Sequence, residues 1–320
     1  MRGLVIKSTG TSYGVYFADG KTAECHVKGN FRIRGIRSTN PVAIGDNVEV
    51  IQGDDGTNWI TEVHDRKNYI VRRSTNLSYA SHILAANLDM AALIVTLRHP
   101  ETSTTFIDRF LATCEAYRVP ACLIFNKVDL LSDAERNDLA SLRGLYESLG
   151  YPTYAISALK DAEVVRGQLA SIFDGRITLL SGNSGVGKST LLNAILGENV
   201  ARTGAISSVH HKGMHTTTFS EMYPLEDTNQ GLESNGLYHS WIIDTPGIKG
   251  FGVLDMQRSE VGHYFREIFE IGRDCRYSDC IHMNEPGCAV NKGVIDGRIA
   301  LSRYESYLSM LDDITENKYR

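Results

Sequence analysis

Two motifs constrain the fold of this chain most strongly, because they occur in the reverse of their usual order. The phosphate-loop pattern G-x-x-x-x-G-K-S is complete, and it consists of Gly182, Asn183, Ser184, Gly185, Val186, Gly187, Lys188 and Ser189. The tetrapeptide that reads guanine in GTP-hydrolysing proteins, Asn126-Lys127-Val128-Asp129, lies 56 residues (182 − 126) before that loop. In ordinary GTPases this tetrapeptide follows the loop. The simplest explanation is a GTPase fold whose sequence is circularly permuted.

Length and charge place the chain among multidomain globular proteins. A length of 320 residues predicts two or three domains, and 42% hydrophobic with 22% charged residues is typical of this class. The net charge of −5 restricts any nucleic-acid surface to a local patch. Residues 1–7 lack the apolar core of a signal peptide, and the longest apolar run, 90–95, is far shorter than the ~20 residues of a membrane span. We therefore expect a cytoplasmic protein with no membrane partner.

Short β-rich runs fill residues 1–70 and predict a small barrel. Glycine-containing turns separate the runs, which span residues 4–6, 13–17, 21–27, 47–51 and 59–63. Five strands in this length favour an OB-fold, although an SH3-like barrel gives a similar pattern. An aromatic residue, Phe31, lies within a basic stretch that contains Lys28, Arg32, Arg34 and Arg37. This composition suits RNA contact, and it equally suits a solvated loop.

Strand and helix patterns alternate in the middle of the chain, which we assign to a GTPase domain at residues 71–254. Residues 68–87 are polar and are expected to be a connector. Strand-like runs then alternate with helical spacing, and Ser132 with Glu135 forms a predicted capping box at a helix start. The strand runs are 90–97, 121–125, 153–156 and 177–180, and the helical runs are 105–117, 132–149, 162–173 and 189–196. Alternation predicts a mostly parallel sheet with helices on both faces and a ligand at the carboxyl ends of the strands.

The phosphate loop supplies the charge that a nucleoside triphosphate needs. Its backbone N–H groups cradle the phosphates, and Lys188 carries a positive charge to the β- and γ-phosphates. The Ser189 hydroxyl is expected to bind Mg²⁺, and the helix N-terminus adds partial positive charge. Thr190 is included among the expected nucleotide contacts. Asp244, after an apolar run, is expected to hold Mg²⁺ through a water, and the Gly247 N–H to contact the γ-phosphate.

The guanine tetrapeptide predicts the choice of base. The Asp129 carboxylate accepts hydrogens from N1 and the exocyclic N2 of guanine, whereas adenine would leave it unpaired. Asn126 is expected to tie the base pocket together, and the Lys127 stem to cover the face of the ring. Ser157 and Ala158 follow the next strand, and the loop they begin resembles the one whose backbone meets guanine O6. GTP is therefore the expected substrate and GDP the product.

Residues 204–221 are polar and suit a nucleotide-dependent switch. Thr217 is our candidate for the Mg²⁺-bound threonine among three consecutive threonines. Ile248 stands where Ras-type enzymes have a water-positioning glutamine, so another group must align the attacking water. His215 is the nearest polar candidate, although an exposed loop histidine without a catalytic role is equally consistent with the sequence.

Three cysteines and a histidine cluster in the last region, residues 255–320, which has an irregular helical pattern. The ligand spacing is Cys275-x4-Cys280-x-His282-x5-Cys288. Three thiolates and one imidazole suit tetrahedral Zn²⁺, and four protein ligands indicate a structural site. Free cysteines beside an unrelated histidine are the alternative.

Together these features resemble one family closely, the circularly permuted ribosome small-subunit-dependent GTPase A proteins of bacteria. The resemblance covers nearly the whole chain. It rests on the motif order, the barrel, the Cys/His spacing and two further stretches, Ala85-Ala86-Asn87-Leu88-Asp89 and Gly213-Met214-His215-Thr216-Thr217-Thr218.

The resemblance implies a late-acting maturation factor that binds the 30S ribosomal subunit and its 16S rRNA. It implies slow GTP hydrolysis that the 30S particle stimulates, rRNA docking by the barrel and the zinc domain, and a catalytic role for His215. One departure is Met214, where members of the family often carry arginine. Two other functions remain open: an RNA-binding scaffold with incidental hydrolysis, which Ile248 motivates, and a permuted GTPase that acts on another RNA. We expect a monomer and assign no role to residues 227–238.

Overall fold

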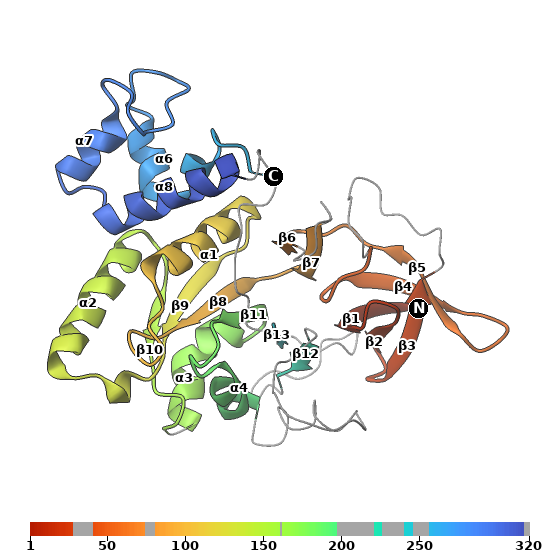
Figure 1. The fold of residues 1–320 in the computed structure, drawn as a ribbon. Coiled ribbons are helices and arrows are strands. Elements are labelled where there is room, and N and C mark those ends of the chain that lie inside the picture. The colour runs from red at the N-terminus through yellow and green to blue at the C-terminus, as the bar shows by residue number, and fades with distance from the viewer. Residues whose placement is uncertain are drawn as a thin grey trace.

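The structure is a computed structural model, and it describes residues 1–27, 41–73, 81–160, 162–196, 221–225, 240–245 and 256–316. These residues form three regions. An all-β region lies at one end, a mixed sheet with helices lies in the middle, and a helical region packs over one helix of the middle region (Figure 1).

A closed five-stranded barrel forms the N-terminal region, as the sequence predicts. Its strands are β1 (Arg2–Ser8), β2 (Tyr13–Phe17), β3 (Thr22–Val27), β4 (Asn47–Gln52) and β5 (Asn58–Val63). They are ordered β1-β2-β3-β5-β4, and β4 pairs back onto β1 to close the barrel. Alternate residues such as Val48 and Val50 on β4 point inward and are fully buried. This topology is that of an OB-like barrel.

The expectation of a polar connector at residues 68–87 is wrong. The structure has an antiparallel hairpin there, made of β6 (Tyr69–Arg73) and β7 (Ser81–Ala86). Val71 and Ile83 bury one side of the hairpin against Ala43 of the barrel region. The polar residues around these few apolar positions hide the strand pattern in the sequence. The hairpin is where the barrel and the middle region meet, because the Ala86 N–H donates to the Ile44 carbonyl at 2.8 Å.

A mostly parallel sheet forms the middle region. Its strands are β8 (Met90–Val95), β9 (Ala121–Phe125), β10 (Thr153–Ala155), β11 (Ile177–Gly182), β12 (Glu221–Pro224) and β13 (Trp241–Asp244). They are ordered β10-β9-β8-β11-β13-β12, and β12 runs antiparallel to β13. All six residues of β8 are buried, as expected for a strand covered on both faces. The short strand β12 was not among the predicted strands.

Helices cover both faces of this sheet. The helices are α1 (Thr104–Ala116), α2 (Asp133–Ser148), α3 (Ala162–Phe173) and α4 (Lys188–Leu196), and a 3₁₀ turn, η1 (Val128–Leu130), follows β9. Leu93 and Val95 share a core with α1 and α2, whereas Ala92 and Ile94 share one with α3 and α4. The predicted capping box of α2 is present, because the Ser132 and Glu135 side chains each accept from the other residue's backbone N–H.

The C-terminal region is helical and packs on α1 (Figure 1). It contains η2 (Val261–Tyr264), α6 (Arg266–Gly272), α7 (Ala289–Ile295) and α8 (Leu301–Glu316). Ala112 of α1 belongs to the same hydrophobic core as Phe265 and Leu311. None of the helices described is long and apolar enough to cross a membrane.

Candidate nucleotide site and metal centre

The Asn126 side chain ties together three loops that are distant in sequence. Its Nδ2 donates to the carbonyl of Val186 in the phosphate loop at 2.9 Å, and its Oδ1 accepts from the N–H of Ala158 at 2.9 Å. Asn126 is buried at the carboxyl end of β9, so these bonds are made away from water. The structure therefore brings the predicted base loop, phosphate loop and Ser157–Ala158 loop to one edge of the sheet.

Lys127 also connects two loops, in a way that the sequence does not predict. Its backbone is left-handed, with φ of 63°, and its Nζ donates to the carbonyls of His99 at 2.5 Å and Gly185 at 2.6 Å. The Gly185 contact joins the base motif to the phosphate loop. The His99 contact adds the turn after β8 to the site. Only the position of His99 beyond the carboxyl end of a buried strand could have indicated this role.

The surroundings of Asp129 favour the ionised form of its carboxyl group, which is the form that the predicted recognition of guanine needs. The Ser157 side chain lies beside it and is the main reason why the pKa of the Asp129 carboxyl is below its usual value, and Lys160 and Arg136 act in the same direction. An ionised carboxylate is the species that can accept two N–H hydrogens from guanine. The Ser157 Oγ itself is buried and makes no hydrogen bond of standard geometry with the described residues.

The phosphate loop needs glycine where it meets Asn126. Gly187 has φ of +95°, and a Cβ there would lie 2.3 Å from the Asn126 Nδ2. Any larger residue would push away the amide that joins the two loops. Val186 is fully buried and anchors the loop, while Ser184, Gly185 and Ser189 remain exposed. The loop thus presents its backbone outward over the start of α4, which is the arrangement that binds phosphates.

Lys188 and Asp244 come together at the adjacent ends of β11 and β13. The Lys188 Nζ lies 2.5 Å from Asp244 Oδ1 and also donates to the Thr245 carbonyl. Both side chains are largely buried. Thr245 is fixed in turn by a 2.9 Å hydrogen bond from its hydroxyl to the Leu180 carbonyl. The lysine predicted to bind phosphate and the aspartate predicted to bind Mg²⁺ are therefore in direct contact. Ser189, which is exposed, and Thr190, which is half-buried, lie on the first turn of α4.

Several predicted residues lie outside the part of the chain that the structure describes. These are His215, Thr217, Gly247 and Ile248 at the nucleotide site, and the basic stretch with Lys28, Phe31, Arg32, Arg34 and Arg37 in the barrel region.

The four predicted metal ligands converge in the C-terminal region. The Sγ atoms of Cys275, Cys280 and Cys288 and a ring nitrogen of His282 all lie within 4.8 Å of one another. The Cys275 and Cys288 sulfurs are 3.9 Å apart, and their distances to His282 Nδ1 are 3.5 and 3.6 Å. Zinc bond lengths in tetrahedral geometry give about 3.8 Å between two sulfurs and about 3.6 Å between sulfur and nitrogen. Cys275, His282 and Cys288 are thus spaced as ligands of one tetrahedral ion, and the Cys280 Sγ lies within 4.8 Å of each of them.

The surroundings of the cluster suit metal binding as well. The Ala289 N–H donates to the Cys275 Sγ and the Asn291 N–H to the Cys288 Sγ, both at 3.4 Å, which stabilises thiolate charge. Burial lowers the pKa of His282, so its imidazole is neutral and can act as a ligand. The Tyr304 hydroxyl donates to the His282 carbonyl at 2.6 Å and joins the cluster to α8.

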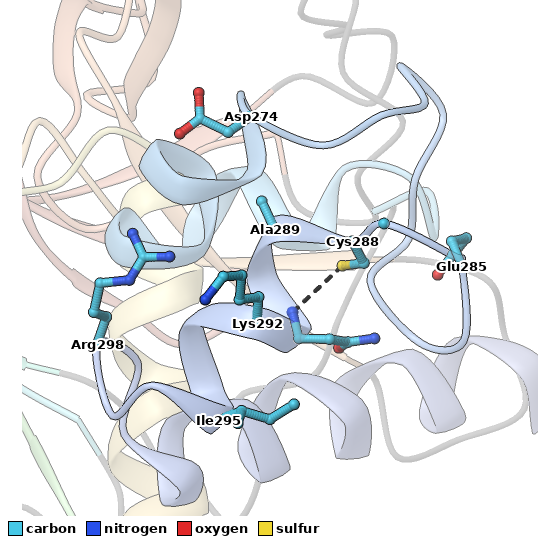
Figure 2. A pocket seen from close by; sticks show the side chains of 9 residues that line it. Asp274, Glu285, Cys288, Ala289, Lys292, Ile295 and Arg298 are labelled. Carbon is cyan, nitrogen blue, oxygen red and sulfur yellow. Dashed lines mark hydrogen bonds between the residues drawn. The ribbon is translucent and has the colours of Figure 1, made fainter.

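A pocket of about 560 Å³ lies beside the metal cluster and not at the nucleotide loops. Figure 2 shows acidic side chains (Asp274 and Glu285) and basic side chains (Lys292 and Arg298) around it, with Cys288 on its wall. Lys292 is already paired with Asp296 at 2.6 Å. The mixed charges give this pocket no clear preference for a ligand.

Comparison with known proteins identifies the class first. The chain is similar over 98% of its length to YjeQ from Thermotoga maritima, with a TM-score of 0.72 and 30% identity over 98% of that chain. It shares its fold with YloQ, described as a circularly permuted GTPase, with a TM-score of 0.70 and 24% identity, over 100% of this chain and 96% of that chain. The fold and the motif order thus define a circularly permuted GTPase, and the predicted circular permutation is confirmed.

The particular family follows from the sequence comparisons. Residues 2–60 match the RsgA N-terminal domain, and residues 63–254 match the RsgA GTPase family. The chain is 56% identical to the small ribosomal subunit biogenesis GTPase RsgA of Phocaeicola vulgatus and 51% identical to that of Porphyromonas gingivalis, each over 100% of this chain and 99% of the relative. The protein belongs to the RsgA family of GTPases and is a GTP hydrolase.

Proposed function

We propose that this GTPase assists late maturation of the small ribosomal subunit. The observation that carries the proposal is full-length similarity to relatives named small ribosomal subunit biogenesis GTPase, at up to 56% identity. The 30S subunit and its 16S rRNA are the proposed partners, the cytoplasm is the proposed location, and a monomer is the proposed state. Docking on the 30S particle is proposed to stimulate hydrolysis of GTP to GDP and phosphate.

Each proposed site residue has one task in this reaction. The loop from Gly182 to Ser189, with Thr190, holds the phosphates, and Lys188 offsets their charge. Ser189, Asp244 and Thr217 would hold Mg²⁺, which polarises the β- and γ-phosphate oxygens when bound. The Gly247 N–H is assigned to the γ-phosphate. The buried carboxylate of Asp244 beside Lys188 supports this assignment, because it offers oxygen atoms of the kind that Mg²⁺ prefers at the expected edge of the sheet.

The base pocket is proposed to comprise Asn126, Lys127, Asp129, Ser157 and Ala158. The hydrogen bonds of Asn126 and the ionised state of Asp129 support this assignment. An Asp129→Asn variant tests it sharply. The amide of asparagine would place its NH₂ donor against the 2-amino group of guanine, which is also a donor. Xanthine has a carbonyl group at C2, which can accept a hydrogen bond from that NH₂. We expect weaker binding of GTP and stronger binding of xanthosine triphosphate, and unchanged preference for GTP would contradict the assignment.

A structural Zn²⁺ is proposed at Cys275, Cys280, His282 and Cys288, in a domain that we place at residues 255–320. The boundaries proposed for the barrel (1–70) and the GTPase domain (71–254) put their junction inside the β6–β7 hairpin. The barrel and the zinc domain are the proposed contacts to rRNA.

His215 is proposed to align the attacking water, because Ile248 cannot do so. The deciding experiment measures GTP hydrolysis with and without 30S particles, for the unchanged protein, for His215→Ala and for Lys188→Ala. We expect strong stimulation of the unchanged protein, loss of stimulation in His215→Ala despite normal binding of GDP, and no activity in Lys188→Ala. Particles alone provide the background.

Two outcomes would favour other functions. Equal turnover with and without 30S particles, together with binding to them, would support an RNA-binding scaffold in which hydrolysis is incidental. Co-sedimentation with 50S and not with 30S particles would support a role on the large subunit.

A further inference from the structure

The strand β12 is held between the barrel and the nucleotide site. On one side Glu221 stands directly opposite Asp244 of β13, and on the other side it stands opposite Lys7 of β1. The sheet therefore continues from the predicted magnesium residue through β12 into the barrel. Directly opposite residues of antiparallel strands have Cβ atoms about 5 Å apart, so Glu221 and Asp244 are close neighbours.

Two carboxylates facing each other would repel unless each has its own cation. Asp244 has Lys188, at 2.5 Å, and Glu221 has Lys7, whose Nζ lies 3.1 Å from Glu221 Oε1. The Tyr223 hydroxyl donates to the other oxygen of Glu221 at 3.0 Å. Burial raises the pKa of Tyr223, and the nearby charges of Glu221 and Asp244 act in the same direction.

Apolar contacts between the barrel and strands β12 and β13 fix the position of Lys7. Leu4 and Tyr16 of the barrel belong to the same hydrophobic core as Met222 of β12 and Trp241 of β13. The Tyr16 and Trp241 rings meet edge to face, with their centroids 5.3 Å apart. The apolar contacts fix the barrel against β12 and β13, so the ammonium of Lys7 is presented to Glu221 by a rigid neighbour.

We propose that Lys7, on the first strand of the barrel, is a positioning residue for GTP hydrolysis. Lys7 neutralises the charge of Glu221 and keeps β12 in register with β13. Asp244 then stays paired with Lys188 and stays in position for the proposed magnesium ion. Without Lys7 the Glu221 carboxylate competes with Asp244 for Lys188 and for the cation. The proposal rests on the proposed role of Asp244 at the magnesium site.

The expected effect is moderate, because the pair is only partly buried. The Lys7 and Glu221 side chains are 42% and 28% exposed, and pairs of this kind change an equilibrium by at most about five-fold. A small displacement at a reacting centre costs rate more than affinity. We therefore expect Lys7→Met to lower kcat about two- to five-fold and to leave the KM for GTP unchanged.

The test compares four variants without ribosomes at saturating Mg²⁺. Lys7→Arg should keep the unchanged kcat, because it keeps the charge. The double variant Lys7→Met/Glu221→Gln should recover most of the loss of Lys7→Met, because it leaves no unpaired carboxylate beside Asp244. Lys21→Met is the matched control, since Lys21 is an exposed barrel lysine whose ion pair, within the part of the chain that the structure describes, is with nearby Asp19. It should behave like the unchanged protein.

Three further measurements separate the explanations. GDP-binding stoichiometry corrects kcat for unfolded protein, and high salt should shrink the difference between Lys7→Met and the unchanged protein. An equal kcat in Lys7→Met and Lys21→Met would overturn the proposal, and so would a double variant no better than Lys7→Met. Asp244→Asn tests the underlying site: full activity there would refute the role of Asp244, whereas a loss there with no effect at Lys7 would refute only the present inference.

Discussion

The barrel and the C-terminal domain are attached to the GTPase domain by different kinds of contact. The barrel shares an apolar core and continuous strands with it, through residues such as Leu4 and Trp241. The C-terminal domain adds a buried ionic network, in which Arg303 of α8 pairs with Asp108 of α1 at 2.7 Å and with Glu267 of α6 at 2.6 Å. Arg303 is 1% exposed and Asp108 0%, so neither ion is solvated by water.

This difference determines how each joint tolerates change. An apolar core loses free energy in proportion to the atoms removed, so a small truncation costs little. A buried ion that loses its partner keeps its full desolvation cost. One substitution at the ionic joint therefore lowers the free energy of unfolding by more than the loss of a single contact. The Tyr146 hydroxyl, which donates to Asp108 at 2.8 Å, extends that network into α2.

Removal of the proposed zinc ion should have the largest effect, because its four ligands lie in the segment that contacts α8, the helix of Arg303. The Tyr307 and Tyr304 hydroxyls of α8 bind the carbonyls of Ile281 and His282 within the cluster. A structural zinc site contributes on the order of 10 kcal/mol to folding of its segment. We expect chelation, or Cys288→Ala, to make residues 256–316 sensitive to protease while GDP binding persists.

The matched control for that experiment is Cys122→Ala, which removes a buried thiol of β9 outside the cluster. Zinc content measured by atomic emission should fall in Cys288→Ala and not in Cys122→Ala. A metal-free protein with the same protease pattern as the unchanged protein would show that the domain is held without metal.

Arg303→Met should be the most damaging single change at the ionic joint. It leaves Asp108 and Glu267 buried without a cation, at a cost of about 3–5 kcal/mol. Urea unfolding followed by fluorescence measures the loss. A triple variant, Arg303→Met/Asp108→Asn/Glu267→Gln, should recover much of it because no charge remains buried. If the triple variant is no more stable than the single variant, the network is held by packing and not by charge.

Ile44→Val tests the apolar joint. Ile44 is buried in the core shared by the barrel and the GTPase sheet, and loss of one methylene there should cost about 1 kcal/mol. The same urea measurement applies. A cost equal to that of Arg303→Met would erase the proposed difference between the joints.

Arg266→Ala should have the smallest effect, although it also removes an ion from the C-terminal joint. Arg266 contacts Glu115 at 2.7 Å and lies over the Tyr151 ring at 4.0 Å, but its side chain is 42% exposed. A partly solvated pair of this kind contributes about 0.5 kcal/mol. A loss of several kcal/mol in thermal or urea unfolding would show that burial does not distinguish Arg266 from Arg303.

Local patterns explain what could be predicted from the sequence. The capping box at Ser132 and the barrel strands each depend on neighbouring residues, and the structure confirms them. The strand and the helix that flank the phosphate-loop pattern, β11 and α4, are present as well. Cys275 and Cys288, which come together in the structure, also lie close to each other in the sequence. Each of these features carries its own signal within a few residues.

Features that depend on distant partners could not be predicted. One partner of Arg303, Asp108, lies 195 residues away on α1, and the pattern of α8 gives no sign of it. The His99 carbonyl contributes to the site through its backbone, which leaves no side-chain signature. β12 has only four residues and depends on its pairing with β13. The β6–β7 hairpin buries its apolar residues against Ala43, which is distant from it in the sequence.

The permuted order also changes what the strand of Asp244 is attached to. In the usual order the strand of Asp244 would lie in the middle of its domain, with further strands of the same sheet following it. Here β13 is the last strand along the chain among the described residues, and the described part of the C-terminal domain resumes 12 residues after Asp244 (256 − 244). Twelve residues span at most about 40 Å when fully extended. The C-terminal domain also packs on α1, so a mechanical load that a partner places on this domain would enter the GTPase domain through α1 and the Arg303–Asp108 pair.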